Sequence, residues 1–249
     1  MRFLAALVLV LAVSAPSAKA EIVTIAADPW PPYISENHPE GGVSIQIIRE
    51  ALGRHGYEVE LTIMPWARAI LSVRRGQFDV LPDTWYTQER GEVLQFSEPY
   101  AVNKLKFIKR ADDNFTYRGL ESLEGKNVGI VRDYGYGKAF YQADFEREAT
   151  SDLIVNLRKL ARNRVDLAIA DELVARYRVH EESPTLIEEI AFVDPPYSTE
   201  DLHVAVGKSN PRGQAIISAF NKGLAEMRRD GTLAAIMEAN DLPLSVITD

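Results

Sequence analysis

The three tryptophans of this chain each stand just after a segment whose apolar residues predict a β-strand. Trp30 follows EIVTIAA, Trp66 follows EVELTIM, and Trp85 follows FDVL, while Asp28 precedes Trp30 and Asp83 precedes Trp85. A single tryptophan is more typical of a protein core, but three at successive strand ends favour a binding surface. Aromatic faces attract cations, so this set predicts a site for a small amine-bearing solute.

Arg90 brings a positive charge to the same region. Thr87 is expected to cap a helix that begins at Gln88, which puts Arg90 in the first helical turn. The helix dipole is already positive there and usually attracts acids. Arginine and the dipole together suit a carboxylate, although a solvated surface arginine is the alternative interpretation.

The second half of the chain repeats the pattern of polar and aromatic residues after strands. The expected strand NVGIV is followed by RDYGYG with Tyr134 and Tyr136, and VDLAIA is followed by Asp171. Each aspartate has a structural alternative, since Asp171 is also a helix N-cap candidate and Asp28 and Asp83 are turn-cap candidates. The predicted ligand site consists of Asp28, Trp30, Tyr33, Trp66, Asp83, Trp85, Arg90, Tyr134, Tyr136 and Asp171.

The elements that position these residues alternate between strands and helices. This order predicts an α/β fold with mostly parallel sheets flanked by helices, in which ligands bind beyond the carboxyl ends of the strands. After RDYGYG the sequence predicts a helix that runs to about Glu148. The chain divides into a first lobe of residues 21–106 plus 205–249 and a second lobe of residues 107–204, because the helical tail follows a strand that returns to the first lobe.

The first twenty residues predict a secretory signal peptide. Arg2 precedes an apolar run from Phe3 to Val13, and Ala18-Lys19-Ala20 is a typical cleavage signal. The apolar run is shorter than the about 20 residues that span a bilayer. We therefore expect a protein that is exported to the periplasm after cleavage at Ala20.

Charge and composition exclude several classes of function. Without residues 1–20 the chain has 26 basic and 36 acidic residues, a net charge of −10 that does not suit contacts with nucleic-acid phosphates. The absence of cysteine excludes disulfides, thiolate chemistry and a lipid-modified cysteine. The four histidines are scattered, and the chain has no G-x-S-x-G, H-E-x-x-H or Walker motif, so we expect no metal and no cofactor.

Several segments together resemble a known family. They are WPPY, GQFDVLPDTWYTQERGEVLQFSEPY, LESLEGKNVGIV, RVDLAIADE and FNKGLAEMRRDGT, in order from about residue 21 to residue 240. The chain is similar to the polar-amino-acid group of periplasmic solute-binding proteins, which feed ABC importers. The resemblance implies two α/β lobes that are joined by two crossover strands and close on a ligand. It also implies an inner-membrane ABC permease as partner, and we expect a monomer.

The resemblance implies roles for individual residues and also shows where this chain departs from the family. Arg90 stands where the family has the residue that binds the α-carboxylate of the ligand. Asp171 stands where the family has the residue that binds the α-ammonium group. Trp30 and Trp66 stand where aromatic residues enclose the ligand side chain in the family. Small residues usually precede the arginine, whereas this chain has PDTWY, and RDYGYG replaces the usual small turn in the second lobe. The predicted pocket is thus bulkier and more acidic, which favours a cationic or zwitterionic ligand.

Two other functions fit the same fold. Relatives of the fold include dehydratases that act on cyclohexadienyl carboxylates, for which Asp83, Asp171 or Glu172 is a candidate acid. A sensory binding protein that presents its ligand to a membrane receptor needs the same closing lobes and is not separable from a transport protein by sequence.

Overall fold

The computed structural model describes residues 20–247, so all but the last residue of the predicted signal peptide lies outside the described residues. Its first lobe begins with three parallel strands that are linked by helices on the pattern β-α-β-α-β. The strand β1 pairs with β2 in a register from Glu21–Tyr57 to Ala27–Ile63. These elements are β1 (Glu21–Ala27), α1 (Val43–Gly53), β2 (Tyr57–Ile63), α2 (Trp66–Arg74) and β3 (Val80–Thr84).

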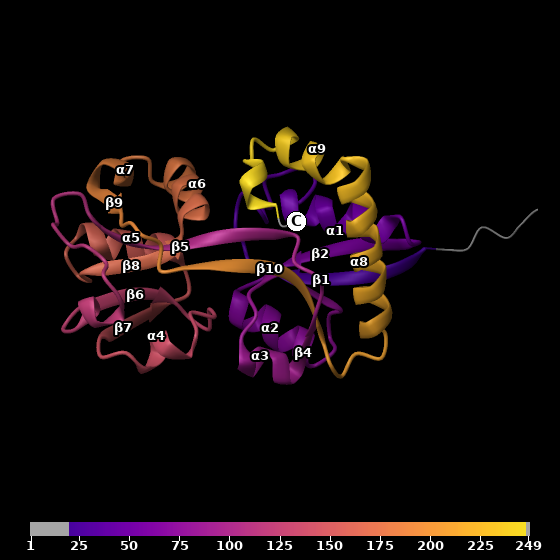
Figure 1. Cartoon of the computed structure of the whole chain (residues 1–249), viewed down its shortest axis with the longest axis horizontal. Coiled ribbons are helices and arrows are strands. Elements are labelled where there is room, and N and C mark those ends of the chain that lie inside the picture. Colours follow the sequence, from indigo (N-terminus) through magenta and orange to yellow (C-terminus); the bar gives the residue numbers. More distant parts are fainter. Residues whose placement is uncertain (1–19, 248–249) are drawn as a thin grey trace, which may run out of the picture.

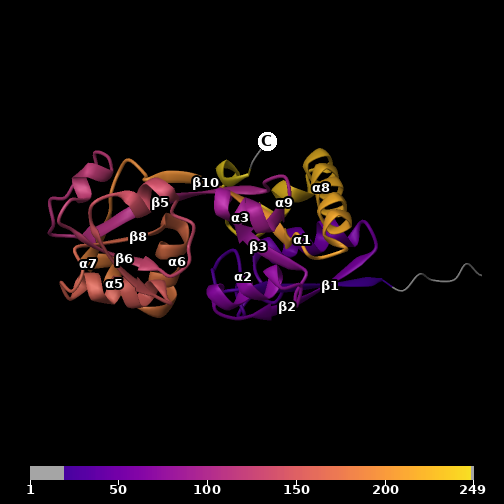
Figure 2. The same ribbon diagram turned by 90° about the horizontal axis from the view of Figure 1, so that it is seen from below.

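Two long strands carry the chain between the lobes (Figures 1 and 2). The strand β10 (Ser198–Gly207) pairs with β3 and β4 (Leu94–Phe96) in the first lobe, and its first half pairs with β5 (Ala101–Arg110). The strand β5 then continues into the second lobe, where it pairs with β8 (Leu167–Asp171). The strands β6 (Asn127–Val131) and β7 (Glu146–Thr150) follow β8 in the sheet. The strand order is therefore continuous, β2-β1-β3-β10-β5-β8-β6-β7, and the two-lobed fold with two crossover strands is confirmed.

The second lobe is built around three parallel strands in the order β8-β6-β7. Its elements are η1 (Leu120–Leu123), β6 (Asn127–Val131), α4 (Lys138–Gln142), β7 (Glu146–Thr150), α5 (Leu153–Ala161), β8 (Leu167–Asp171), α6 (Glu172–Glu182), α7 (Leu186–Glu189) and β9 (Ile190–Phe192). The remaining elements lie in the first lobe and are α3 (Gln88–Val93), β4 (Leu94–Phe96), α8 (Gly213–Asp230), α9 (Thr232–Ala239) and η2 (Leu244–Val246).

Burial follows from the sequence pattern of each element. The central strands β3 and β8 are buried along their whole length, as expected for parallel strands with helices on both faces. The helix α1 buries Val43, Ile47, Ile48 and Ala51, which recur at helical spacing on one face. The edge strand β2 alternates between exposed and half-buried residues. The strand ends that face the other lobe are thereby held by rigid cores.

One predicted element is wrong. The segment expected to be a helix up to about Glu148 forms only the short helix α4, and β7 follows it as a strand. Arg147 explains the early end of the helix, because its guanidinium donates to the carbonyls of Phe140 and Ala143 and ties the chain into a turn. The strand β7 then pairs in parallel with β6. A long-range pairing thus overrides the local helical pattern.

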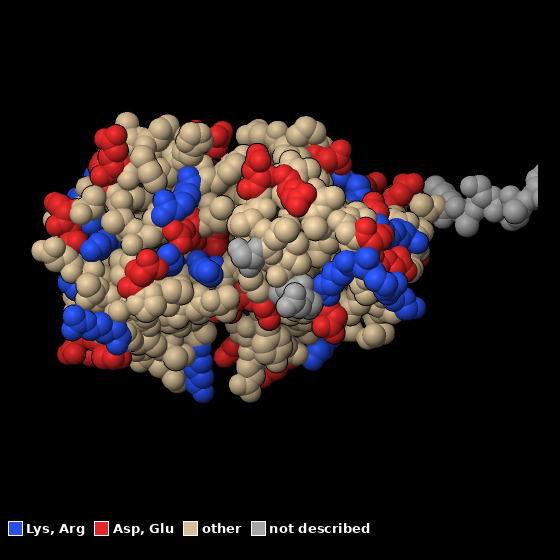
Figure 3. Space-filling model, turned by 45° about the horizontal axis from the view of Figure 1, so that its top comes forward, with Lys and Arg blue, Asp and Glu red and all other residues tan. Residues whose placement is uncertain are grey.

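On the face that Figure 3 shows, several basic side chains lie together at the right-hand end of the first lobe, beside acidic ones. Acidic and basic residues are interspersed there, over the second lobe in particular. Within residues 20–247, the helices are too short or too polar to cross a membrane.

Candidate functional site

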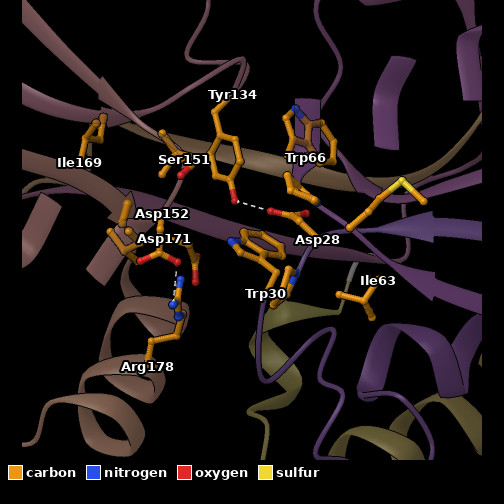
Figure 4. Close-up of a pocket in the computed structure, with 16 residues that line it drawn as sticks. Asp28, Trp30, Ile63, Trp66, Tyr134, Ser151, Asp152, Ile169, Asp171 and Arg178 are labelled. Carbon is orange, nitrogen blue, oxygen red and sulfur yellow. Dashed lines mark hydrogen bonds and ion pairs between the residues drawn. The ribbon is translucent and has the colours of Figure 1, made fainter. Parts of the chain in front are cut away.

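A cavity of about 350 Å³ lies between the two lobes, at the carboxyl ends of strands from both (Figure 4). This is the position at which open parallel sheets bind ligands, and the volume lies in the range of small-molecule sites. The first lobe lines it with the residues that follow β1 and β2, and the second with those that follow β6, β7 and β8. The principal lining residues are Asp28, Trp30, Met64, Trp66, Tyr134, Ser151, Asp152, Asp171 and Arg178.

The DPWPPY segment forms one wall of this cavity. Trp30 is buried, and its ring stacks on that of Tyr33 with the centroids 4.9 Å apart. Trp30 and Ile34 exchange two backbone hydrogen bonds of 2.9 and 3.0 Å, which close the loop. Tyr33 does not line the cavity but supports Trp30 from beneath, so the two predicted aromatic residues have different roles.

Asp28 meets the second lobe inside the cavity. The Tyr134 hydroxyl donates a hydrogen bond of 2.9 Å to Asp28 Oδ2 (Figure 4). Burial raises the pKa of Asp28 to about 7, although this hydrogen bond acts in the opposite direction. Asp28 is therefore a carboxyl group poised to change its charge near neutral pH.

Asp171 both caps a helix and lines the cavity. One of its carboxylate oxygens accepts a 2.7 Å hydrogen bond from the Val174 amide at the start of α6, and the other accepts one of 3.2 Å from the Lys104 amide. Burial raises its pKa to about 7. The two interpretations that the sequence left open for this residue thus describe the same side chain.

A second, much smaller chamber of about 20 Å³ adjoins the main cavity. Asp83 lines it and accepts hydrogen bonds from the hydroxyls of Ser44 (2.7 Å) and Tyr100 (2.6 Å). Its Oδ2 atom and the indole nitrogen of Trp85 are buried without a hydrogen-bond partner among the described residues. Burial raises the pKa of Asp83 to about 6.

Arg90 also borders the small chamber and is buried, with an exposed fraction of 8%. The predicted N-cap is confirmed, since the Thr87 hydroxyl accepts a hydrogen bond from the Arg90 amide. The guanidinium donates to the carbonyl of Trp85 (3.0 Å) and, across the lobes, to that of Asp133 (2.9 Å). Its Cζ atom also lies 5.1 Å from the centre of the Trp66 ring. Burial lowers the pKa of Arg90 to about 10, so it stays charged at neutral pH.

The loop after β6 brings Tyr134 into the cleft. The Asp133 carbonyl accepts a second hydrogen bond, of 3.0 Å, from the indole of Trp66. The Tyr134 ring packs edge-on against Trp66 and Trp85, with centroid distances of 5.8 and 5.5 Å. Asp133 has a φ of 62°, a conformation that is uncommon for residues other than glycine. Tyr134 and Asp133 therefore occupy the place beside Arg90 that the sequence predicted for the ligand.

Tyr136 is placed differently from the other predicted residues. Its ring is buried in the second lobe and stacks on Phe140 with the centroids 4.9 Å apart. Its hydroxyl accepts a 3.0 Å hydrogen bond from the Val131 amide. It holds the loop that carries Tyr134 and lines neither chamber.

The sequence did not identify two charged residues of the cavity, Asp152 and Arg178. Asp152 caps α5 and also pairs with Arg178 at 2.9 Å, while Glu182 pairs with the same guanidinium at 2.7 Å. Asp152 follows β7, the strand that the sequence did not predict. Arg178 lies seven residues after Asp171, so helical periodicity puts both on one face of α6. This spacing could have predicted that Arg178 lines the cavity.

Metal-binding clusters of histidine and acidic residues do not occur within residues 20–247. The groups that the cavity offers are carboxylates, one paired guanidinium and aromatic faces. This set binds cations by charge and by cation–π contact.

Comparisons with known proteins agree with the fold. The L-cystine-binding protein TcyJ of Escherichia coli K12 is 24% identical over 200 residues, which cover 79% of this chain and 73% of the relative. A histidine kinase sensor domain with similarity to periplasmic binding proteins superposes with a TM-score of 0.77 at 23% identity and covers 93% of this chain and 99% of its own. A mutant of ArgBP from T. maritima superposes with a TM-score of 0.75 at 21% identity and covers 88% and 94%.

The similarity to solved structures shows the fold, and the match of the sequence to a family model shows the family. The model of the bacterial extracellular solute-binding proteins, family 3, matches residues 22–240, which is nearly the whole described chain. The chain belongs to the bacterial extracellular solute-binding proteins, family 3.

Proposed function

We propose that this protein is the periplasmic substrate-binding component of an ABC importer and captures a small amine-bearing solute between its lobes. The observation that carries the proposal is the interlobe cavity, whose wall combines the half-buried Asp28 and the buried Asp171 with Trp30 and Trp66. Curated relatives named as amino-acid-binding proteins, some of them for ABC transporters, support import of an amino-acid-like solute. The protein would hand its ligand to an inner-membrane permease.

Closure of the lobes is the proposed mechanism. The first lobe consists of residues 21–106 and 205–249, and the second consists of residues 107–204. The strands β5 and β10 connect them. A ligand that touches both lobes binds the closed state more tightly than the open one and therefore shifts the population toward closure. Asp28, Trp30 and Trp66 on one lobe and Tyr134 and Asp171 on the other are the proposed ligand contacts. Tyr33 and Tyr136 would support them from behind.

A thermal-shift screen tests this function. The exported form, beginning at residue 21, is unfolded and refolded to remove carried-over ligand and is then melted with amino acids, amines and organic acids. A true ligand at about a hundred times its dissociation constant adds about 2.7 kcal/mol of stability, which gives a clear rise in melting temperature. A panel in which no amino acid or amine raises the melting temperature contradicts the proposal.

Substitution of Asp28 locates the ligand in the cavity. Asp28→Asn keeps the shape of the side chain but removes its charge, and charge-assisted hydrogen bonds contribute about 1.5–3 kcal/mol. We expect affinity for an amine ligand to fall by about tenfold or more, measured by calorimetry. The matched control is Asp112→Asn, since the side chain of Asp112 is 88% exposed and far from the cavity lining. Equal affinities of the two variants would remove Asp28 from the site.

A further inference from the structure

Arg90, the charge that the sequence offered for a ligand carboxylate, has both Nη atoms engaged by the protein itself. One donates to the Trp85 carbonyl and the other to the Asp133 carbonyl of the opposite lobe. Gly135 packs against the same guanidinium, because a Cβ built on it would lie 2.9 Å from Nη1. These two bonds use two of the five guanidinium N–H donors, so a carboxylate would have to pair with the three that remain.

The space that adjoins Arg90 on the side of the main cavity is also small. The chamber that Arg90 borders measures about 20 Å³. This volume suits a single water molecule, since a water needs about 10–15 Å³ of such space. Tyr134 borders both this chamber and the main cavity, together with Asp28, Trp30 and Trp66. A ligand in the main cavity therefore meets Tyr134 where the family resemblance places the α-carboxylate receptor.

The charges that line the main cavity are suited to a cation without a carboxylate. Arg178 is its one cationic lining residue among those the structure describes, and it is already paired with Asp152 and Glu182. Asp28 and Asp171 have no cationic partner within ion-pair distance among residues 20–247 and keep raised pKa values because burial disfavours their charge. Two carboxyl groups that face a cavity without counter-cations, Asp171 buried and Asp28 half-buried, are suited to accept ammonium groups.

We infer that the ligand is a small amine that lacks an α-carboxylate, of the diamine or guanidino-amine class, with its cationic group bound by Asp28 and Asp171. Its carbon chain lies against Trp30 and Trp66, and Arg90 is a contact that closes the lobes. The inference rests on the proposed function and narrows its substrate class.

Matched pairs that differ only in the carboxylate test the inference. Calorimetry compares lysine with cadaverine and arginine with agmatine on the refolded protein. We expect the affinity for the amine of each pair to be at least about ten times higher than the affinity for the corresponding amino acid. An amino acid that binds as tightly as its amine, or more tightly, overturns the inference and leaves the proposed function standing. If no amine and no amino acid raises the melting temperature in the thermal-shift panel, both the inference and the proposed function are overturned.

Two variants of Tyr134 test the wall between the chambers. Tyr134→Ala joins the small chamber to the cavity and uncovers space beside Arg90, so we expect the preference for the amine to fall by about tenfold. Tyr134→Phe keeps the ring and loses the hydrogen bond to Asp28, and we expect it to retain the preference even though its affinities change. A preference that is the same in the alanine variant as in the native protein contradicts the role of Tyr134. Circular dichroism of both variants verifies their fold.

Discussion

At the scale of single residues, the cavity depends on carboxyl groups whose charge is not settled at neutral pH. Burial raises the pKa of both Asp28 and Asp171 to about 7. The groups that act on Asp28 are the Tyr134 hydroxyl, Asp83 and Arg178, and Glu172 acts on Asp171. Between about pH 4 and pH 7 the unfolded chain has released these protons and the folded protein retains them, so the pair costs stability as pH rises through this window.

The same carboxyl groups should make ligand affinity depend on pH, in the opposite direction to the stability of the ligand-free protein. A bound ammonium group favours the ionised carboxylates, so below about pH 7 binding must expel protons. We expect affinity for an amine ligand to rise between about pH 5.5 and about pH 8, by up to about tenfold per pH unit for each proton released. Calorimetry in two buffers of different ionisation enthalpy measures the protons directly. An affinity that is constant over this range would exclude both carboxyl groups from ligand contact.

At the scale of elements, the loop between β6 and α4 makes contacts across the cleft between the lobes. Its Asp133 carbonyl accepts hydrogen bonds from Arg90 and Trp66 of the first lobe. These partners stand in the first turns of α3 and α2, and both helices pack on strands of the sheet. The loop therefore meets a preformed surface, and a small change in its bulk alters closure without touching the core of either lobe.

Gly135→Ala is the corresponding prediction. Its Cβ would lie 2.9 Å from Arg90 Nη1 and 3.0 Å from Thr87 Cγ2, so the Arg90 guanidinium must shift and its hydrogen bond across the lobes to the Asp133 carbonyl is disturbed. We expect about a tenfold loss of ligand affinity with little change in the melting temperature of the ligand-free protein. Gly53→Ala is the control, because a Cβ there meets nothing within 4 Å. Equal affinities of the two variants would show that the loop does not limit closure.

At the scale of the whole molecule, the balance between open and closed lobes depends on contacts that cross the cleft. The structure is closed, with Tyr134 reaching Asp28 and Arg90 reaching Asp133. Hydrogen bonds to charged groups contribute about 1.5–3 kcal/mol, which is enough to shift a balance between two states by more than tenfold. The crossing strands β5 and β10 keep the lobes connected in either state.

Small-angle scattering measures this balance. We expect Arg90→Met to have a larger radius of gyration than the native protein without ligand, because the contact with Asp133 is lost. Arg49→Met removes an exposed ion pair with Glu40 and serves as the control, with no expected change. Scattering curves of Arg90→Met that match those of the native protein would contradict the role of Arg90 in closure.

The sequence by itself determined the α/β class, the family and the strand ends at which the ligand-facing residues stand. These features follow from local patterns, since apolar periodicity specifies strands and helices, and parallel strands gather their carboxyl ends at one edge. The N-caps Thr87 and Asp171 were predictable for the same reason, because a cap is satisfied within one helical turn.

The tertiary structure alone decided which of these residues line one cavity. Tyr134 lies beside Asp28, and the Asp133 carbonyl beside Arg90, through contacts between lobes that join residues far apart in sequence. Tyr136 packs on Phe140 in the second lobe instead of facing the cavity, and the pairing of β7 with β6 placed Asp152 at the cavity. Local patterns specify an element and its faces, but they carry no information about which distant side chain fills the space in front of it.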